Sequence, residues 1–289
     1  MRLLALLAAG VALFAGAWVA AEPLAPNEMG RVMILEYHRI DRPESRWTRT
    51  PENFRRDLQR LWEGGYRLVA LNDYLDNTIK LPRGASPVIL TFDDSSPGQF
   101  RYVQRQGEWV IDPECAIGIL EAFEREHPEF GHAATFFVLP GADRPNRLFD
   151  QTDLATRKLQ HLAARYEIGN HTLWHANLAK YPESVVREQI AVAQEWIGKH
   201  VPGYRPRALA LPFGEYPREI AWAVSGRVGT TAYRHDAILM VAGGPAPSPR
   251  SPQLDRVRLP RIQATQADLD RWLTHFERHP SERYVSSGQ

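Results

Sequence analysis

The sequence has 289 residues, a length that suits one large α/β domain or two small ones. Its 35 basic and 34 acidic residues nearly balance, which removes the usual electrostatic argument for nucleic-acid binding. The single cysteine excludes an internal disulfide. Because no linker-like stretch divides the chain, we expect one domain whose partner is not nucleic acid.

The first residues of the chain have the pattern of a secretory signal: one positive charge, an apolar run, and the small residues Val19-Ala20-Ala21. The pattern favours cleavage before Glu22 and a mature domain over residues 22–289. The alternative is that residues 1–21 stay as a membrane anchor, because Leu3–Val19 is nearly long enough to span a bilayer. We expect a protein that is secreted or held in the cell envelope, with membrane contact only if the leader is retained.

Apolar strands and amphipathic helices alternate along most of the remaining chain. Strands are predicted at residues 31–38, 66–71, 88–92, 132–138, 166–171, 208–211, 230–233 and 256–262. Helices are predicted after Thr50, Asn72, Asp112, Pro182, Pro217 and Thr265, and over residues 158–165. This alternation is typical of an α/β fold with a parallel sheet, open or closed into a barrel, whose working edge lies at the carboxyl ends of the strands.

The polar stretch from Ser95 to Val110 is too long for an ordinary connection. It contains Tyr102, Trp109 and several amide side chains, which suit contacts with sugars. We interpret it as a candidate binding loop, with a plain surface insertion as the alternative.

Asp93 and Asp94 stand where the buried strand at residues 88–92 ends. Neighbouring side chains in a strand point to opposite faces, so both can serve one site only where the chain turns out of the sheet. Two adjacent carboxylates repel each other unless a cation or a shared proton relieves them, so the pair suggests a metal with a separate base. The alternative is a capped turn, since Asp and Ser are common turn residues.

His171 and His175 are four residues apart, the spacing that lets two imidazoles reach one metal ion if the segment is a helical turn. Together with one of the two aspartates they make a three-ligand site with open positions, typical of a catalytic divalent ion, and zinc is favoured. The other aspartate is then free to act as a base. Such an ion promotes attack of water on an amide or ester.

At this point the chain resembles the polysaccharide deacetylases of the carbohydrate esterase class, which include chitin, peptidoglycan and poly-N-acetylglucosamine deacetylases. The matching stretches, in the order of the family, are Thr91-Phe-Asp-Asp94, Ala134-Thr-Phe-Phe-Val138, His171-Thr-Leu-Trp-His175 and Leu211-Pro-Phe-Gly214. The resemblance implies a distorted (β/α) barrel of about seven strands. Glu36-Tyr-His38 and Pro51-Glu-Asn-Phe54 look most like the exported branch that acts on N-acetylglucosamine polymers.

The resemblance also assigns roles to matching positions. It implies Asp94, His171 and His175 as metal ligands, Asp93 as the general base, Thr172 as a brace of the second motif, the backbone N–H of Phe213 as an oxyanion donor, and Pro212 and His38 as further residues on the substrate side. The expected reaction is hydrolysis of the N-acetyl group of an N-acetylglucosamine-type sugar in an envelope or extracellular glycan, with a divalent metal ion as cofactor.

The chain departs from the family pattern at three motifs. The third motif normally begins with an arginine that orients the base, and Ala210 takes that position; Arg261 could replace it from a neighbouring strand, unless it is merely a solvated arginine. The Asp-x-x-Asp-Trp motif is absent, and the final Leu-x-His motif has only a formal match at His275, which lies off the inward face of a predicted helix. His235 and His38 are the other candidates, so the acid is not assigned.

Two other functions remain open from the sequence. The missing motifs permit a domain of this fold that binds glycan and turns it over poorly, although such a module has no need of a free base beside a full metal site. A metal amidase or esterase acting on another acyl substrate is the second alternative. Export argues against small metabolites as substrates and therefore favours an envelope polymer.

Overall fold

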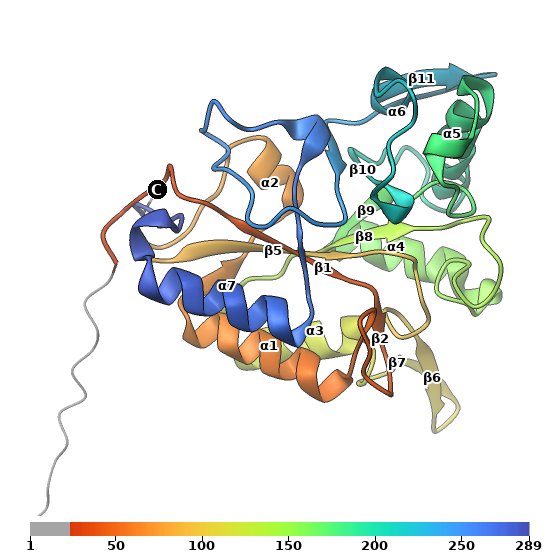
Figure 1. Ribbon diagram of the computed structural model, residues 1–289. Helices are drawn as coiled ribbons and strands as arrows, with labels where there is room; N and C mark the ends of the chain where they lie inside the picture. The colour runs from red at the N-terminus through yellow and green to blue at the C-terminus, as the bar shows by residue number, and fades with distance from the viewer. Residues whose placement is uncertain (1–23, 289) are drawn as a thin grey trace, which may run out of the picture.

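The computed structural model describes residues 24–288, and Figure 1 shows their course. The predicted leader, residues 1–21, lies outside the described residues. Within residues 24–288 we find no helix with the length and apolar character needed to cross a membrane.

A parallel sheet forms the centre of the molecule. Its strands are β1 (Met33–Tyr37), β4 (Tyr66–Leu68), β5 (Ser86–Phe92), β8 (Thr135–Val138), β9 (Glu167–Asn170), β10 (Ala208–Ala210), β13 (Ala237–Leu239) and β14 (Ile262–Gln263). Seven of them follow the order β13-β10-β9-β8-β5-β1-β14, and β4 pairs with the first half of β5. Every pair in this sheet is parallel, which confirms the α/β class predicted from the alternating pattern.

One short segment joins the two edges of the sheet. Leu259 forms a bridge with Leu239 at the β13 edge, and three residues later Ile262 pairs with Leu35 of β1 at the other edge. The sheet is therefore a distorted barrel of about seven strands, as the family resemblance implied. The side chain between these two contacts, Arg261, is fully buried.

Helices cover the outside of the sheet (Figure 1). They are α1 (Pro51–Glu63), α2 (Leu71–Leu75), α3 (Ala116–Glu126), α4 (Ala155–Arg165), α5 (Glu183–His200), α6 (Ala221–Val224) and α7 (Gln266–Arg278). The predicted caps of two helices are confirmed: Thr50 Oγ1 accepts a hydrogen bond from Asn53 N (3.2 Å), and Thr265 Oγ1 accepts one from Asp268 N (3.1 Å). Local sequence thus sets where these helices begin.

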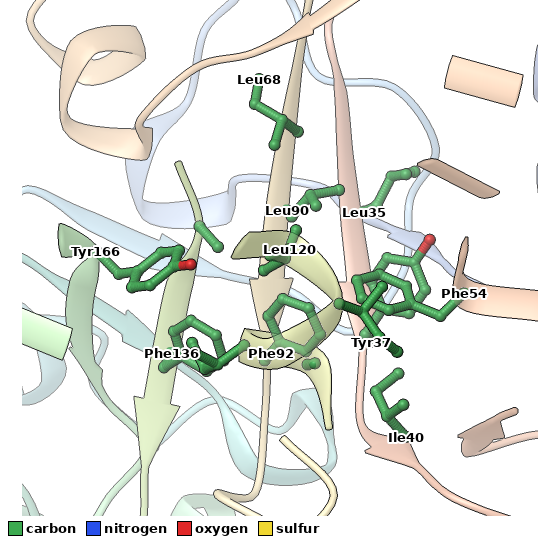
Figure 2. Close-up of a cluster of buried hydrophobic side chains, with 14 of the residues drawn as sticks. Leu35, Tyr37, Ile40, Phe54, Leu68, Leu90, Phe92, Leu120, Phe136 and Tyr166 are labelled. Atoms are coloured by element: carbon green, nitrogen blue, oxygen red, sulfur yellow. The ribbon is translucent and has the colours of Figure 1, made fainter. Parts of the chain in front are cut away.

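The main core lies between the sheet and its helices, and Figure 2 shows part of it. Phe92 of β5 stacks on Phe136 of β8 with ring centroids 4.7 Å apart, and Tyr37 of β1 packs against Phe54 of α1 at 5.0 Å. Truncating a buried phenylalanine to alanine typically costs about 3–5 kcal/mol. Because side chains alternate along a strand, this packing turns the other set of β1 and β5 side chains into the barrel interior.

Three two-stranded ribbons flank the barrel: β2 (Arg39–Ile40) with β3 (Thr48–Arg49), β6 (Tyr102–Arg105) with β7 (Glu108–Ile111), and β11 (Ser225–Val228) with β12 (Thr231–Arg234). The predicted long loop after Asp94 is thus partly a hairpin, β6–β7, which turns at Gln106 and Gly107, both at positive φ. The strand predicted at residues 230–233 belongs to the third ribbon and not to the barrel.

Further predictions differ from the structure in where an element begins or in its type. Helix α3 begins at Ala116 and not at Asp112, because Asp112 Oδ1 accepts from Glu114 N and the intervening residues form a turn first. The strand predicted at residues 256–262 is mostly a 3-10 turn, Arg256–Arg258, followed by the short strand β14. Strand β13 (Ala237–Leu239) was not predicted, although it lies in the apolar run Ala237–Val241.

Candidate metal and active site

Asp93 and Asp94 reach one region because the chain turns sharply after β5. Asp93 continues the inward side of the strand and is buried. Asp94 and Ser95 have φ values of 79° and 44°, in the left-handed region that Asp tolerates better than most residues. The turn that the sequence required therefore exists, and it gives the two carboxylates different surroundings.

Asp94, His171 and His175 form a group of three possible metal ligands. Asp94 Oδ1 lies 3.2 Å from His171 Nε2 and 3.3 Å from His175 Nε2, and all the donor atoms are within 4.8 Å of one another. Donors about 2.0–2.1 Å from a tetrahedral ion are about 3.3 Å apart. The three side chains therefore fit one divalent ion.

The two histidines come together without a helix. The segment after β9 turns through positive φ values at Thr172 (70°) and His175 (67°), and Thr172 Oγ1 accepts a hydrogen bond from Ala176 N (3.2 Å). The segment is not the helical turn that the four-residue spacing suggested. His171 and His175 are nevertheless close enough to bind one ion, as that spacing predicted. Thr172 lies where the resemblance expected a brace, and its contact closes this turn.

The two imidazoles differ in how readily they offer a nitrogen to a metal. His171 Nδ1 lies 2.9 Å from the carbonyl oxygen of Ala210, which can only accept, so Nδ1 carries a proton and Nε2 faces Asp94. Burial lowers the pKa of His171, but the charges of Asp93 and Asp94 outweigh it and raise the pKa, so an ion would take the place of the proton on Nε2. Burial, together with the neighbouring His171, lowers the pKa of His175 to about 4, so this ring is neutral at neutral pH. The donor chemistry therefore agrees with the spacing.

Asp93 is held by an arginine from the segment that closes the barrel. Arg261 Nη1 donates to Asp93 Oδ1 (2.8 Å) and Nη2 to Asp93 Oδ2 (2.7 Å), a bidentate pair in which both side chains are buried. Burial raises the pKa of Asp93, but the charge of Arg261 outweighs it and holds the pKa below its usual range. Arg261 is therefore not a solvated arginine, and it contacts the predicted base directly.

Sequence reasoning gave no role to Glu36, which contacts the same guanidinium. Arg261 Nη2 donates to Glu36 Oε1 (2.9 Å), and Glu36 Oε2 is buried with no hydrogen-bond partner among the described residues. Burial raises the pKa of Glu36 well above its usual value. A neutral Glu36 beside ionised Asp93 and cationic Arg261 balances the charge. The available signal was a glutamate inside the apolar strand Met33–Tyr37.

Glu36, His38 and Asp93 form a second group whose donor atoms lie within 4.8 Å of one another. Arg261 already occupies this group with its charge, since it donates to both carboxylates. A second positive charge there would be repelled in a buried environment. The first group, with Asp94, is therefore the better candidate for a metal.

Of the three histidines considered as the acid, the structure brings His38 to the site. Its Nε2 lies 3.9 Å from Glu36 Oε1, and burial lowers its pKa. His235 belongs to neither ligand group, and its Nδ1 lies 2.8 Å from the carbonyl oxygen of Ala223. His275 is on α7 and pairs with Glu282 at 2.9 Å. His235 and His275 therefore contact groups outside the site, which leaves His38 as the candidate acid of the three.

Phe213 lies at the rim of the metal-ligand group. It follows β10 in the 3-10 turn Pro212–Gly214 and has a φ of 61°. Its ring is 4.5 Å from that of His175, and its side chain is largely exposed. Pro212 is buried and fixes the start of the turn. Phe213 is therefore next to one of the predicted metal ligands, and its role as an oxyanion donor stays a prediction.

Comparison with known proteins supports the same family. The sequence model of the family described as polysaccharide deacetylase matches residues 80–233, just over half of the chain. A chitooligosaccharide deacetylase from Bradyrhizobium sp. (strain ANU 289) is 25% identical over 149 residues, which is 52% of this chain and 55% of that protein. The chain therefore matches about half the length of this curated relative.

Several solved structures share the fold. A Streptococcus pyogenes deacetylase, PplD, in complex with acetate has a TM-score of 0.62 and 19% identity, covering 84% of this chain and 97% of that one. IcaB from Ammonifex degensii has a TM-score of 0.58 and 19% identity, covering 85% and 96%. BC0361, a polysaccharide deacetylase from Bacillus cereus, has a TM-score of 0.61 and 18% identity, covering 84% and 68%. Taken with the matching sequence model, these findings show that the chain belongs to the polysaccharide deacetylase family.

Proposed function

We propose that this protein is a metal-dependent deacetylase that hydrolyses the N-acetyl group of N-acetylglucosamine-type sugars in an envelope or extracellular glycan. The observation that carries the proposal is a three-donor group directly beside a carboxylate that is clamped by a buried arginine. A binding module needs no such base. The name of the chitooligosaccharide deacetylase supports the class of substrate.

Asp94, His171 and His175 would hold the ion, and their one oxygen and two nitrogen donors favour zinc. An ion bound there would supply polarisation of the acetamide carbonyl and a more acidic water. Two of the three donors, Asp94 and His175, are partly exposed, so substrate and water can approach from the solvent side.

Asp93 accepts the proton of the attacking water. The bidentate contact with Arg261 fixes the plane of this carboxylate and keeps it ionised, so that it can act as a general base at neutral pH. The backbone N–H of Phe213 donates to the oxygen that becomes negative in the tetrahedral intermediate. The contact with Arg261 orients Asp93 before the substrate arrives.

His38 gives a proton to the leaving amine. An amide nitrogen is a poor leaving group unless it is protonated, so the reaction needs an acid as well as a base. His38 lies on the Asp93 side of the site, next to Glu36. Burial lowers its pKa, so the ring is mostly neutral at neutral pH and gives a proton only after it takes one up; the proton that Asp93 accepts from the attacking water supplies it. We assign the acid to this residue.

The deciding experiment measures acetate release from N-acetylglucosamine oligomers by the purified protein, after chelation and again after zinc is restored. Release that requires zinc and is lost in Asp93→Asn supports the proposal. A protein that binds zinc and releases no acetate from any acetylated sugar is not a deacetylase of this class. Fractionation of cells that express the full chain tests the secreted or envelope location.

A further inference from the structure

Two large aromatic side chains stand exposed beside the site. Trp47 is 37% exposed, and its ring centroid lies 4.6 Å from that of His38. Phe213 is 61% exposed, and its ring lies 4.5 Å from that of His175. Exposing aromatic surface to water is unfavourable, so an exposed ring in contact with a reactive group suggests that a ligand covers it.

The order of the strands places these rings on opposite sides of the reactive groups. Trp47 is tied to the segment after β1, since Arg39 N donates to its carbonyl oxygen (3.0 Å), whereas Phe213 follows β10. Between β1 and β10 lie β5, β8 and β9, so the two are four strand spacings apart. Four spacings amount to about 19 Å in a flat sheet and less in a curved one. The two rings therefore flank the reactive groups, one next to His38 and the other next to His175.

Both rings are fixed by their surroundings. The guanidinium of Arg46 lies 4.7 Å from the centroid of Trp47, while His38 packs on the same indole. A small hollow next to this tryptophan is lined by Glu36, His38, Arg46 and Gln263. Phe213 is held in a left-handed conformation that a bulky residue adopts only at a cost. Rings that are already ordered lose little conformational entropy when a ligand stacks on them.

We propose that Trp47 and Phe213 are stacking platforms for the sugars on either side of the one that is deacetylated. The apolar faces of pyranose rings suit flat aromatic surfaces, whose quadrupole attracts C–H edges. The acetylated sugar then lies between His38 and His175, and its neighbours in the chain lie over the two rings. The protein thus acts on internal residues of a polymer. This inference rests on the proposed function.

The test compares acetate release from N-acetylglucosamine oligomers of two to six units. In the unmodified protein, kcat/KM rises with length until both rings are covered. In Trp47→Ala, the hexamer loses on the order of tenfold in kcat/KM and the dimer much less. In Phe213→Asn, which changes the residue that carries the proposed oxyanion donor, both oligomers lose activity and the hexamer loses on the order of tenfold more than the dimer. Asparagine tolerates the positive φ of position 213. Trp47→Phe, which keeps a flat ring, restores most of the dependence on length.

Trp196→Ala is the matched control, because Trp196 is also 37% exposed but lies on α5. This control keeps the dependence on length. An equal loss at every length in Trp47→Ala means that Trp47 acts only through His38, and it overturns the proposal. So does a kcat/KM that is independent of length in the unmodified protein, although the deacetylase assignment then stands.

A binding measurement separates failure of this inference from failure of the proposed function. Calorimetric titration of the inactive Asp93→Asn protein with the dimer and the hexamer gives affinities that do not depend on turnover. Tighter binding of the hexamer, lost in the Trp47→Ala and Phe213→Asn backgrounds, supports the platforms even if no acetate is released. Equal affinity for both oligomers contradicts them.

Discussion

Asp93 and Asp94 are neighbours in the chain, yet they belong to two different environments. The Asp93 side chain is 1% exposed and is paired with Arg261, whereas that of Asp94 is 19% exposed and faces two histidines. The buried group is a closed arrangement with its charge already balanced. In the open group, Asp94 is paired only with the two histidines, and Asp94 and His175 are accessible to solvent. The difference in burial therefore goes with a difference in role. The closed side, Asp93 with Arg261, positions a base. The open side, Asp94 with His171 and His175, is accessible to an ion and a substrate.

Neutralising Asp93 and Asp94 one at a time tests whether the two carboxylates have different roles. Asp93→Asn is expected to lower kcat by about 10³-fold, because it removes the base, while zinc content stays unchanged. Asp94→Asn is expected to lose zinc and activity together. Acetate release and metal analysis on both variants check this. If Asp93→Asn also loses zinc, the two carboxylates do not have separate roles.

Replacing Arg261 tests how strongly its positive charge stabilises the buried carboxyl groups of Asp93 and Glu36. Arg261→Met leaves Asp93 and Glu36 buried without their partner, which is expected to cost about 3–5 kcal/mol in the free energy of unfolding. Urea denaturation of the metal-free protein measures it. The double variant Arg261→Met/Asp93→Asn should recover part of the loss, because it removes the buried negative charge that lacks a partner. No recovery would mean that the unpaired charge of Asp93 is not the cause.

Two substrates with different leaving groups can distinguish a role of His38 as the acid from an effect on the metal ligands. His38→Gln is expected to lower kcat about 10²-fold on an acetamido sugar, because its amine must be protonated as it leaves. An aryl acetate, whose leaving group needs no proton, should be affected far less. A loss of the same size on both substrates would show that His38 does not act as the acid.

The smallest expected effect concerns the protonation of Glu36. Because its pKa is raised in the folded protein, the folded state keeps a proton that the unfolded state releases. This contribution to stability is fully present below the unfolded pKa and is lost as pH rises toward the folded pKa, by at most about 1.4 kcal/mol per pH unit. Glu36→Gln removes that dependence.

Urea denaturation of the metal-free wild-type and Glu36→Gln proteins from pH 5 to pH 8 measures this contribution. The variant should gain stability relative to the wild type as pH rises. A difference in stability that stays constant across this range would show that Glu36 is ionised in the folded protein.

The open side was predictable from the sequence because its residues follow the ends of strands. Asp94 is the second residue after β5 and His171 the first after β9, and the carboxyl ends of parallel strands meet at one edge. The donor spacing was not predictable, since it depends on the positive φ values of Thr172 and His175. Turns of this kind leave no periodic signal in the chain.

The closed side was harder to predict because it depends on distant pairings. Arg261 is 168 residues from Asp93 in the sequence, so its contact could be offered only as a hypothesis. Glu36 enters the site through the register of β1 and β5, in which it pairs with Thr91. A glutamate in an apolar strand signals an unusual residue, but its partner is set by how the barrel closes.

Locating the ion tests most directly whether Asp93 and Asp94 have separate roles. Anomalous diffraction at the zinc edge from crystals of the metal-loaded protein gives its position. We expect one ion bound by Asp94, His171 and His175, with Arg261 still paired to Asp93. An ion bound by Glu36, His38 and Asp93, the other group with suitable spacing, would displace that pair and contradict the division between base and metal ligand.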